Sequence, residues 1–400
     1  MTTRRHARLA LDGGRPVRAT LLPYARQQIS DEDVAAVAAA LRSDWLTTGP
    51  GVPRFEASLA AATGARHAVA FSSGTAALHG AMVAAGLGPG DEAITTPLTF
   101  VATANAVLYA GAEVRFADVD AGNLLIDPAK VVAALTPRTR AIVAVDYAGH
   151  PADYESLRRA AGRAPGGPLT IIADASHSLG AVRDGRHVGT MADMTTLSFH
   201  PAKLLTTGEG GAVLTDQDDL AACLRRFRNH GIATELAARM DWTYAMVELG
   251  YNYRLTDIGA ALGSSQLARL DEFLARRRDL AVSYAANLAG HRYLDLPTVE
   301  AGTNPAWHFL FVQLRLDRLT VDRGGVYRAL RAEGIGVNVH YIPVHQHPFY
   351  RERYPGSAFP VVDAAYDRLL TLPLFAGMTS ADVGDVVAAL DKVTRAYGTD

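Results

Sequence analysis

The chain contains a single cysteine, Cys223, in 400 residues. One cysteine excludes an internal disulfide, and its alanine, leucine and arginine neighbours supply no metal ligands, so we expect an inert buried thiol. Long apolar runs are also missing. No stretch is long enough to span a bilayer, and the N-terminal residues MTTRRHARLALDGGRPVRA lack the apolar core of a signal peptide. These absences predict a cytoplasmic protein.

An excess of either charge is absent too, because 39 basic residues nearly cancel 41 acidic ones. This balance argues against a generally basic nucleic-acid binder and favours a small-molecule partner. The length exceeds the size at which one hydrophobic core keeps growing, so two domains are expected.

Apolar periodicity predicts an α/β fold. Ser30 and Asp33 cap an amphipathic helix that continues through Val34, Val37 and Leu41. Seven short apolar runs then alternate with helical segments, which predicts a mostly parallel sheet covered on both faces. The runs are residues 67–71, 92–97, 113–120, 140–147, 169–174, 194–199 and 211–216.

Beyond residue 216 the pattern becomes helical. One long helix is predicted from Asp257 through Leu280, bridging two domains. Mixed strands and helices follow at residues 307–316 and 326–343, which suits a smaller α/β domain. We expect a large domain with an N-terminal arm over residues 1–270 and a small C-terminal domain over residues 271–400.

The segment SFHPAKLLTTGEGG, residues 198–211, contains Lys203 between two predicted strands. A lone lysine in a turn is usually a solvated surface charge. At this edge of an α/β sheet, however, burial can lower an amine pKa enough for a Schiff base, and pyridoxal phosphate is the candidate carbonyl partner. TTGEGG is not a Walker loop, because the lysine precedes the glycines.

The cofactor makes separate demands that other segments meet. Asp174 ends the strand LTIIAD, where its carboxylate suits a pyridine nitrogen, although it equally suits a helix cap. In FSSGTAALHG, residues 71–80, Thr75 and the N–H groups of Thr75 and Ala76 suit a phosphate, as does the Ser198 hydroxyl. An ordinary strand-to-helix turn has the same local sequence.

Five ordered motifs together resemble the vitamin-B6-dependent sugar aminotransferases of the DegT/DnrJ/StrS family. They are FSSGTAALHG, TTPLTFVATANA (95–106), DASHSLGA (174–181), SFHPAKLLTTGEGG and GYNYRLTDIGAALGSSQL (250–267). The resemblance covers nearly the whole chain. It implies the aspartate aminotransferase architecture, PLP-dependent transferase fold type I: a large domain with a seven-stranded, mainly parallel sheet and a smaller C-terminal α/β domain.

The resemblance also implies roles for residues around the cofactor ring. Lys203 corresponds to the lysine that binds pyridoxal 5'-phosphate and moves the substrate proton. Asp174 corresponds to the partner of the pyridine nitrogen, His177 to the polar group near the ring oxygen, and Phe100 to the aromatic side chain stacked on the ring. For Phe100, an ordinary core position is the alternative.

Further roles follow for the phosphate and the amino donor. Thr75, Ala76 and Ser198 match phosphate contacts from one subunit, and Asn252 matches the contact from its neighbour, so the resemblance implies a homodimer with shared active sites. Arg254 is a candidate for a carboxylate of the donor, L-glutamate, and a structural salt bridge is the alternative.

Three histidines, His340, His345 and His347, lie close together in VHYIPVHQHPFY. Their spacing fits no structural zinc pattern, and Pro343 and Pro348 interrupt the segment, so no metal site is expected. By resemblance this loop lies near a nucleotide-sugar site, which makes His340 a candidate substrate contact.

The segment LRSDWLTTGPGVPRFE, residues 41–56, is most similar to the pseudaminic-acid branch and implies that Trp45 and Thr47 lie near the substrate. That branch transfers nitrogen from glutamate to C4 of UDP-2-acetamido-2,6-dideoxy-β-L-arabino-hexos-4-ulose in a ping-pong reaction. The chain departs from the branch in SSGTAAL and at Ala173, which leaves the nucleotide and the sugar configuration open.

Three alternatives stand beside this function. In the first, the ketone is a TDP-keto sugar or a keto-cyclitol of antibiotic assembly. In the second, the protein is a sugar dehydratase, which Lys203 opposes because relatives of that type carry histidine at this position. In the third, it is a non-catalytic cofactor-binding sensor. No DNA-binding appendage supports the last reading.

Overall fold

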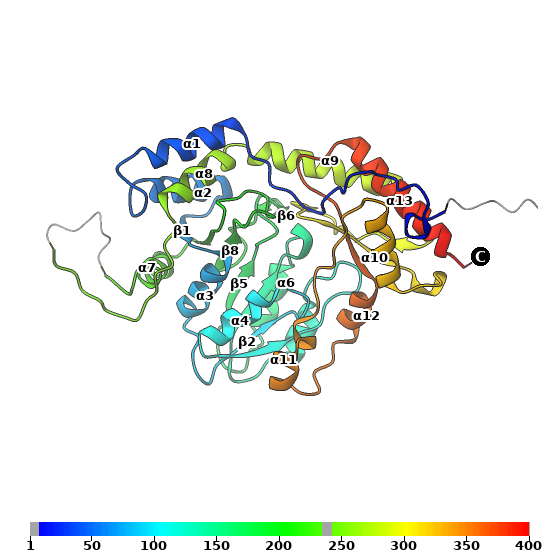
Figure 1. The fold of residues 1–400 in the computed structure, drawn as a ribbon. Helices are drawn as coiled ribbons and strands as arrows, with labels where there is room; N and C mark the ends of the chain where they lie inside the picture. Colours follow the sequence, from blue (N-terminus) through cyan, green and yellow to red (C-terminus); the bar gives the residue numbers. More distant parts are fainter. Residues whose placement is uncertain (1–7, 234–241, 400) are drawn as a thin grey trace, which may run out of the picture.

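The computed structural model describes residues 8–233 and 242–399. A seven-stranded sheet in the order β1-β9-β8-β5-β4-β2-β3 occupies its centre (Figure 1). Strand β9 runs antiparallel to both neighbours, and the remaining pairs are parallel. The strands are β1 His67–Phe71, β2 Glu92–Thr95, β3 Glu113–Phe116, β4 Thr139–Val145, β5 Thr170–Asp174, β8 Met194–Ser198 and β9 Gly211–Thr215. All seven predicted apolar runs therefore form strands, and the mostly parallel sheet is confirmed.

Alternate residues of each strand pack into two separate cores, because successive side chains point to opposite faces. In β4, Ile142 and Ala144 join a core with α2, α5, α6 and α8, whereas Ala141 and Val143 join a core with α3, α4 and α7. Helices thus cover both faces of the sheet. They are α2 Gly51–Thr63, α3 Gly74–Ala84, α4 Val101–Tyr109, α5 Pro128–Ala134, α6 Tyr154–Ala161, α7 Asp218–Phe227 and α8 Asp257–Leu267.

The predicted cap of the first long helix, α1 Asp31–Leu41, is present. The Ser30 hydroxyl accepts from the Asp33 N–H, and the Asp33 carboxylate accepts from the Ser30 N–H. The apolar positions Val34 and Leu41, however, are 60% and 57% exposed in the single chain. The amphipathic pattern therefore leaves an apolar face without cover within one chain.

The prediction of one long helix from Asp257 through Leu280 is wrong. Helix α8 ends at Leu267, and α9 Leu270–Leu288 begins after a break at Ala268 and Arg269. Arg269 has a non-helical ψ of 13°, and its guanidinium bonds the buried carboxylate of Asp33, 2.6 Å away. The apolar periodicity continues across this break, so periodicity alone did not reveal it.

A second core lies around a three-stranded antiparallel sheet in the order β10-β12-β13. Leu9 and Leu22 of the N-terminal arm join this core. The boundary between the large and the small domain at residue 270 stays a prediction. The elements here are β10 Leu294–Asp295, β12 Leu310–Leu314, β13 Leu369–Leu372, α10 Arg323–Ala332, α12 Pro360–Arg368 and α13 Ser380–Tyr397; a small third sheet has β6 Val182–Arg183, β7 Arg186–His187 and β11 Thr303–Asn304.

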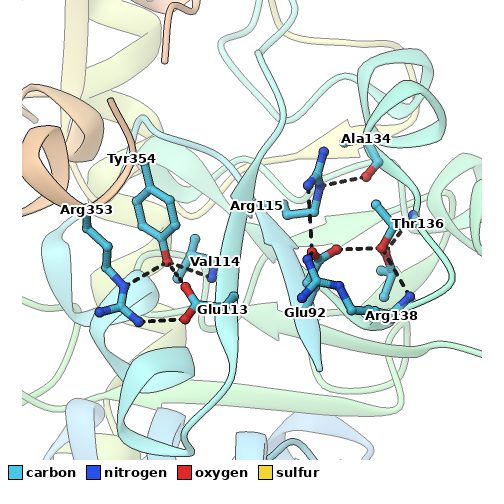
Figure 2. A network of polar contacts seen from close by, with 10 residues as sticks. Glu92, Glu113, Val114, Arg115, Ala134, Thr136, Arg138, Arg353 and Tyr354 are labelled. Atoms are coloured by element: carbon cyan, nitrogen blue, oxygen red, sulfur yellow. Dashed lines mark hydrogen bonds and ion pairs between the residues drawn. The ribbon is translucent and has the colours of Figure 1, made fainter. Parts of the chain in front are cut away.

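A short helix, α11 Pro348–Arg353, carries the C-terminal part of the chain back to the edge of the large sheet (Figure 1). Figure 2 shows Tyr354 and Arg353 on Glu113 at the start of β3: the Tyr354 hydroxyl donates to Glu113 Oε2 over 2.7 Å, and Arg353 Nη2 is 2.6 Å from Oε1. Beside them, the buried Glu92 of β2 is held by Arg138. The two contacts with Glu113 hold the segment that follows residues 340–347 against β3.

No helix in the described ranges is long and apolar enough to cross a membrane.

Candidate active site

A cavity of about 420 Å³ opens at the carboxyl ends of β4, β5 and β8, whose last residues Val145, Asp174 and Ser198 form part of its wall. Ligands bind at this edge in open α/β sheets. Seven of the predicted site residues line the cavity. They are Thr75, Phe100, Asp174, His177, Ser198, Lys203 and His340.

Lys203 sits in the turn between β8 and β9, held by a bond from its N–H to the His200 carbonyl. Burial lowers the pKa of its amine to about 8, although the Asp174 carboxylate acts in the opposite direction. A substantial fraction of the amine is therefore neutral near physiological pH. The alternative of a solvated surface lysine is not what the structure shows, because Lys203 lines the cavity.

The Asp174 carboxylate is held at the cavity wall by two hydroxyls. Thr103 Oγ donates to Oδ2 over 2.7 Å, and Ser176 Oγ donates to Oδ1 over 2.6 Å. Asp174 is followed by a turn, so the interpretation as a helix cap is wrong. Its carboxylate is oriented toward the cavity that Lys203 also lines.

His177 is clamped between two aromatic side chains. Its ring stacks on His308 with centroids 4.5 Å apart, and its Nε2 is 3.1 Å from the Tyr341 hydroxyl. Burial, and then the charge of Lys203, lower the pKa of both His177 and His308 well below the ordinary range. Both rings are thus neutral near pH 7, and His177 Nδ1 is buried without a partner in the described residues.

His340 also lies in the wall as a neutral ring, since burial lowers its pKa to about 3. Its Nδ1 is 2.9 Å from Thr371 Oγ1, and it stacks on Phe309. No metal-binding group of three or more histidine, cysteine or acidic side chains occurs in the described residues. His345 instead pairs with Asp363.

The amino end of α3 forms one side of the cavity. Ser73 is the N-cap, and its hydroxyl accepts from the Ala76 N–H over 3.1 Å. Ala76 does not line the cavity, whereas Ser73, Gly74 and Thr75 do. A Cβ added at Gly74 would lie 2.8 Å from Cβ of Ser198, so the two segments approach as closely as only glycine allows.

Phe100 is 58% exposed at the cavity mouth and tilts against Tyr341, with centroids 5.9 Å apart. The alternative that Phe100 is an ordinary core residue is therefore wrong. An exposed aromatic ring beside a cavity is available to stack on a flat ligand.

Four predicted site residues lie outside this cavity, near one another. The backbone of Thr47 forms an isolated β-bridge with Thr256, and the backbone of Asn252 forms one with Asn229. The Asn229 side-chain oxygen accepts a hydrogen bond from the Arg254 guanidinium over 2.8 Å. Trp45 is 50% exposed and lines a separate groove between α1 and α8. Within one chain, Trp45, Thr47, Asn252 and Arg254 do not reach the wall around Lys203.

The structure adds wall residues that the sequence did not single out. Tyr341 directly follows His340, Ser176 directly precedes His177, and Thr103 lies in the motif TTPLTFVATANA, so closeness to a motif residue is a usable signal for all three. Tyr24 and His308 come from distant segments. Nothing local in the sequence marks those two.

Solved sugar aminotransferases share this fold. Helicobacter pylori PseC, an aminotransferase involved in the biosynthesis of pseudoaminic acid, aligns with a TM-score of 0.89 at 28% identity over 94% of this chain and 100% of that one. The sugar aminotransferase Spr1654 of Streptococcus pneumoniae, solved in its PMP form, gives 0.88 at 27% over 94% and 99%. The fold is therefore that of the aminotransferases.

The chain belongs to the DegT/DnrJ/EryC1/StrS aminotransferase family, whose sequence pattern matches residues 27–391. It is 39% identical over 381 residues to the spore coat polysaccharide biosynthesis protein SpsC of Bacillus subtilis, covering 94% of this chain and 97% of that protein. The family is PLP-dependent, and the chain is a PLP-dependent sugar aminotransferase.

The residues present fit pyridoxal phosphate. The cavity places a largely desolvated amine, Lys203, and a hydroxyl-anchored carboxylate, Asp174, in one wall. At the amino end of α3, Gly74, Thr75 and Ser198 line the cavity together, and the end of a helix beside two hydroxyls suits a phosphate. His177 Nδ1 offers a buried polar atom that still lacks a partner.

Proposed function

We propose that this chain works in the cytoplasm as a homodimer that transfers an amino group from L-glutamate to C4 of a nucleotide-linked 4-keto-6-deoxy sugar. The proposed ketone is UDP-2-acetamido-2,6-dideoxy-β-L-arabino-hexos-4-ulose. The observation that carries the transfer chemistry is the pair Lys203 and Asp174 in one cavity wall, with the lysine pKa lowered to about 8.

Bound pyridoxal phosphate supplies a carbonyl for the amine and a pyridine ring that withdraws electrons from the reacting carbon. Lys203 binds the cofactor and moves the proton at that carbon. Asp174, oriented by Thr103 and Ser176, keeps a proton on the pyridine nitrogen. In this proposal Phe100 lies against the ring and His177 contacts its oxygen.

Phosphate binding is proposed for the amino end of α3. Thr75 and Ser198 offer hydroxyls to the anion, and the partial positive charge of a helix N-terminus adds to their effect. The Ala76 N–H is shared with the Ser73 hydroxyl, so we assign Ala76 a weaker contact than Thr75.

Charge balance supports an active site shared between two subunits. Among the described residues that line the cavity, Lys203 is the sole lysine or arginine, while Asp174 and Glu209 bring carboxylates. Glutamate, the cofactor phosphate and a nucleotide diphosphate are all anionic and need cations or strong donors. We propose that Asn252 and Arg254, which lie away from this chain's cavity, serve the neighbour's cavity.

Exposed apolar side chains support the same dimer. Helix α1, the segment that directly follows it and the segment that precedes α8 expose large apolar groups that a soluble monomer seldom presents together. Trp45 and Thr47 lie on this face and are proposed to approach the sugar nucleotide in the neighbouring subunit. The exposed residues include Val34, Leu41, Trp45, Leu46, Trp242, Met246, Val247 and Leu249.

Support for the ketone comes from likeness. PseC is an aminotransferase involved in the biosynthesis of pseudoaminic acid, and SpsC is a spore coat polysaccharide biosynthesis protein; the likeness to PseC supports the proposed ketone. The neutral rings of His308 and His340 in the cavity wall suit hydroxyl and acetamido groups, which need hydrogen bonds rather than charge.

The first test is the visible absorption of the PLP-loaded protein before and after L-glutamate. We expect the spectrum to change and 2-oxoglutarate to appear, and Lys203→Ala to give neither. A loaded protein whose spectrum ignores glutamate contradicts the proposed donor. A panel of UDP- and TDP-linked 4-keto and 3-keto sugars and a keto-cyclitol, read by product mass, then separates the proposed ketone from its alternatives.

A further inference from the structure

Asp146 is a fully buried carboxylate that the proposed chemistry does not use. It follows the last residue of β4, and its three hydrogen-bond partners are uncharged. Oδ1 accepts from the Ala152 N–H over 2.8 Å and from the Tyr154 hydroxyl over 2.6 Å, and Oδ2 accepts from the Ser178 hydroxyl over 2.5 Å. Burying a carboxylate without a cation is costly, so this position calls for an explanation.

Strand geometry places Asp146 behind the cavity wall. Val145 pairs with Asp174 across β4 and β5, and both residues line the cavity. Because successive side chains alternate between the faces of a sheet, Asp146 points to the opposite face, where it meets Tyr154 of α6. Asp146 is absent from the cavity wall and therefore acts through other residues.

Two hydrogen bonds connect Asp146 to the segment that carries residues of the cavity wall. The Ser178 hydroxyl ties its carboxylate to the turn that carries His177, whose Nε2 is 3.1 Å from the Tyr341 hydroxyl. The backbone N–H of Asp146 also donates to the Asp174 carbonyl over 3.0 Å. One residue thus anchors both ends of the turn between Asp174 and Ser178.

We propose that Asp146 is a positioning residue that, through Ser178, fixes the His177 ring in the cofactor cavity against Tyr341 and His308. The contacts are independent of any ligand, whereas the consequence for cofactor binding rests on the proposed function. Without the anchor, the turn keeps its backbone bond from the Ser178 N–H to the Ala175 carbonyl but loses its side-chain tie to β4.

The test compares Ser178→Ala and Asp146→Asn with Ser283→Ala, a serine substitution on α9 remote from the cavity. Histidine-selective ¹⁵N NMR of the cofactor-free protein, with the His177 signal assigned from His177→Gln, reads the ring directly. We expect the His177 resonances to shift or broaden in Ser178→Ala and Asp146→Asn and to stay unchanged in Ser283→Ala. Unchanged His177 resonances in both variants would overturn the proposal.

A second readout titrates each folded variant with pyridoxal 5'-phosphate and records affinity and visible circular dichroism. We expect Ser178→Ala to weaken affinity by about tenfold, the lower end of the effect that supporting hydrogen bonds have at metal sites, and to reduce the dichroic band. If Ser178→Ala lowers the melting temperature but leaves the His177 resonances and the dichroic band unchanged, the role of Asp146 is merely structural, and the proposal that it positions His177 is contradicted. If wild-type protein binds no cofactor, the proposed function fails while the NMR result still decides the role of Asp146.

Discussion

The His177 ring stacks on the His308 ring with centroids 4.5 Å apart and planes 20° from parallel. These residues come from opposite parts of the chain, one after β5 and one before β12. Each ring is buried, and Lys203 adds a positive charge nearby, so the pKa of each lies well below the ordinary value. The stack is a neutral surface that can donate and accept hydrogen bonds.

Neither ring is therefore expected to titrate between about pH 5.5 and about pH 8, where an exposed imidazole changes charge. The ¹⁵N shifts of His177 and His308 should stay constant through this range in the cofactor-free protein. Protonation of either ring within it would show that water reaches the stack. Asp146→Asn leaves both rings buried and should not bring their titration into the range.

Lys203 should react as an amine that loses its proton near pH 8. Because burial lowers this pKa from 10.5 to about 8, the neutral fraction grows as pH rises through about 8. Amine labelling of the cofactor-free protein, quantified by mass spectrometry at each pH, should give a midpoint there for Lys203. The exposed Lys130 is the reference amine in the same chain, and identical profiles at the two positions would contradict the burial.

Gly74→Ala should weaken binding of pyridoxal 5'-phosphate. The added methyl would meet Cβ of Ser198 at 2.8 Å and its hydroxyl at 3.0 Å, so one of the two segments must move. If the overpacking of about 1–3 kcal/mol falls on the cofactor-bound form, it corresponds to a loss of about fivefold to about 150-fold in affinity. Gly384→Ala on α13, where a Cβ meets nothing within 4 Å, is the matched control. Equal affinities of the two variants would contradict the proposed phosphate site at the amino end of α3.

Mixing inactive subunits tests the shared active site. Lys203→Ala and Asn252→Ala are each expected to be nearly inactive, and mixed dimers combine the intact Lys203 of one chain with the intact Asn252 of the other. Random mixing should restore about a quarter of wild-type activity, since half of the dimers then hold one intact site. Lys203→Ala mixed with Asp174→Ala should restore nothing, because both residues line one chain's cavity. Equal recovery in both mixtures, or none in either, would contradict sharing through Asn252.

Much of the large sheet was predictable because its strands are short apolar runs buried on both faces. Residues 67–71, for example, were predicted as a strand and form β1 with those bounds. The end of α8 was not predictable, since the apolar spacing continues through Arg269 while a tertiary contact with Asp33 accompanies the break. Periodicity records which face is buried and carries no signal for such a contact.

The site was predictable where chemistry and local motif coincide. Lys203 and Asp174 close or follow strands, so the sheet topology brings them together at one edge. His308 was missed because the backbone of a remote loop delivers it: its N–H donates to the Ala148 carbonyl, and Gly149 is so close that a Cβ there would lie 3.0 Å from the His308 nitrogen. Such an approach depends on the assembled fold.

The contacts of Tyr354 and Arg353 with Glu113 affect when the cofactor cavity is completed while the chain is being synthesised. His340 and Tyr341 reach the cavity only after about five-sixths of the chain has been translated, and their segment stays in place through contacts with β3. A ribosome-bound chain synthesised through β9 already contains all seven strands of the large sheet and Lys203. Its cavity still lacks the part of the wall that His340 and Tyr341 supply. Cofactor capture by nascent chains should therefore begin late, once α11 has docked.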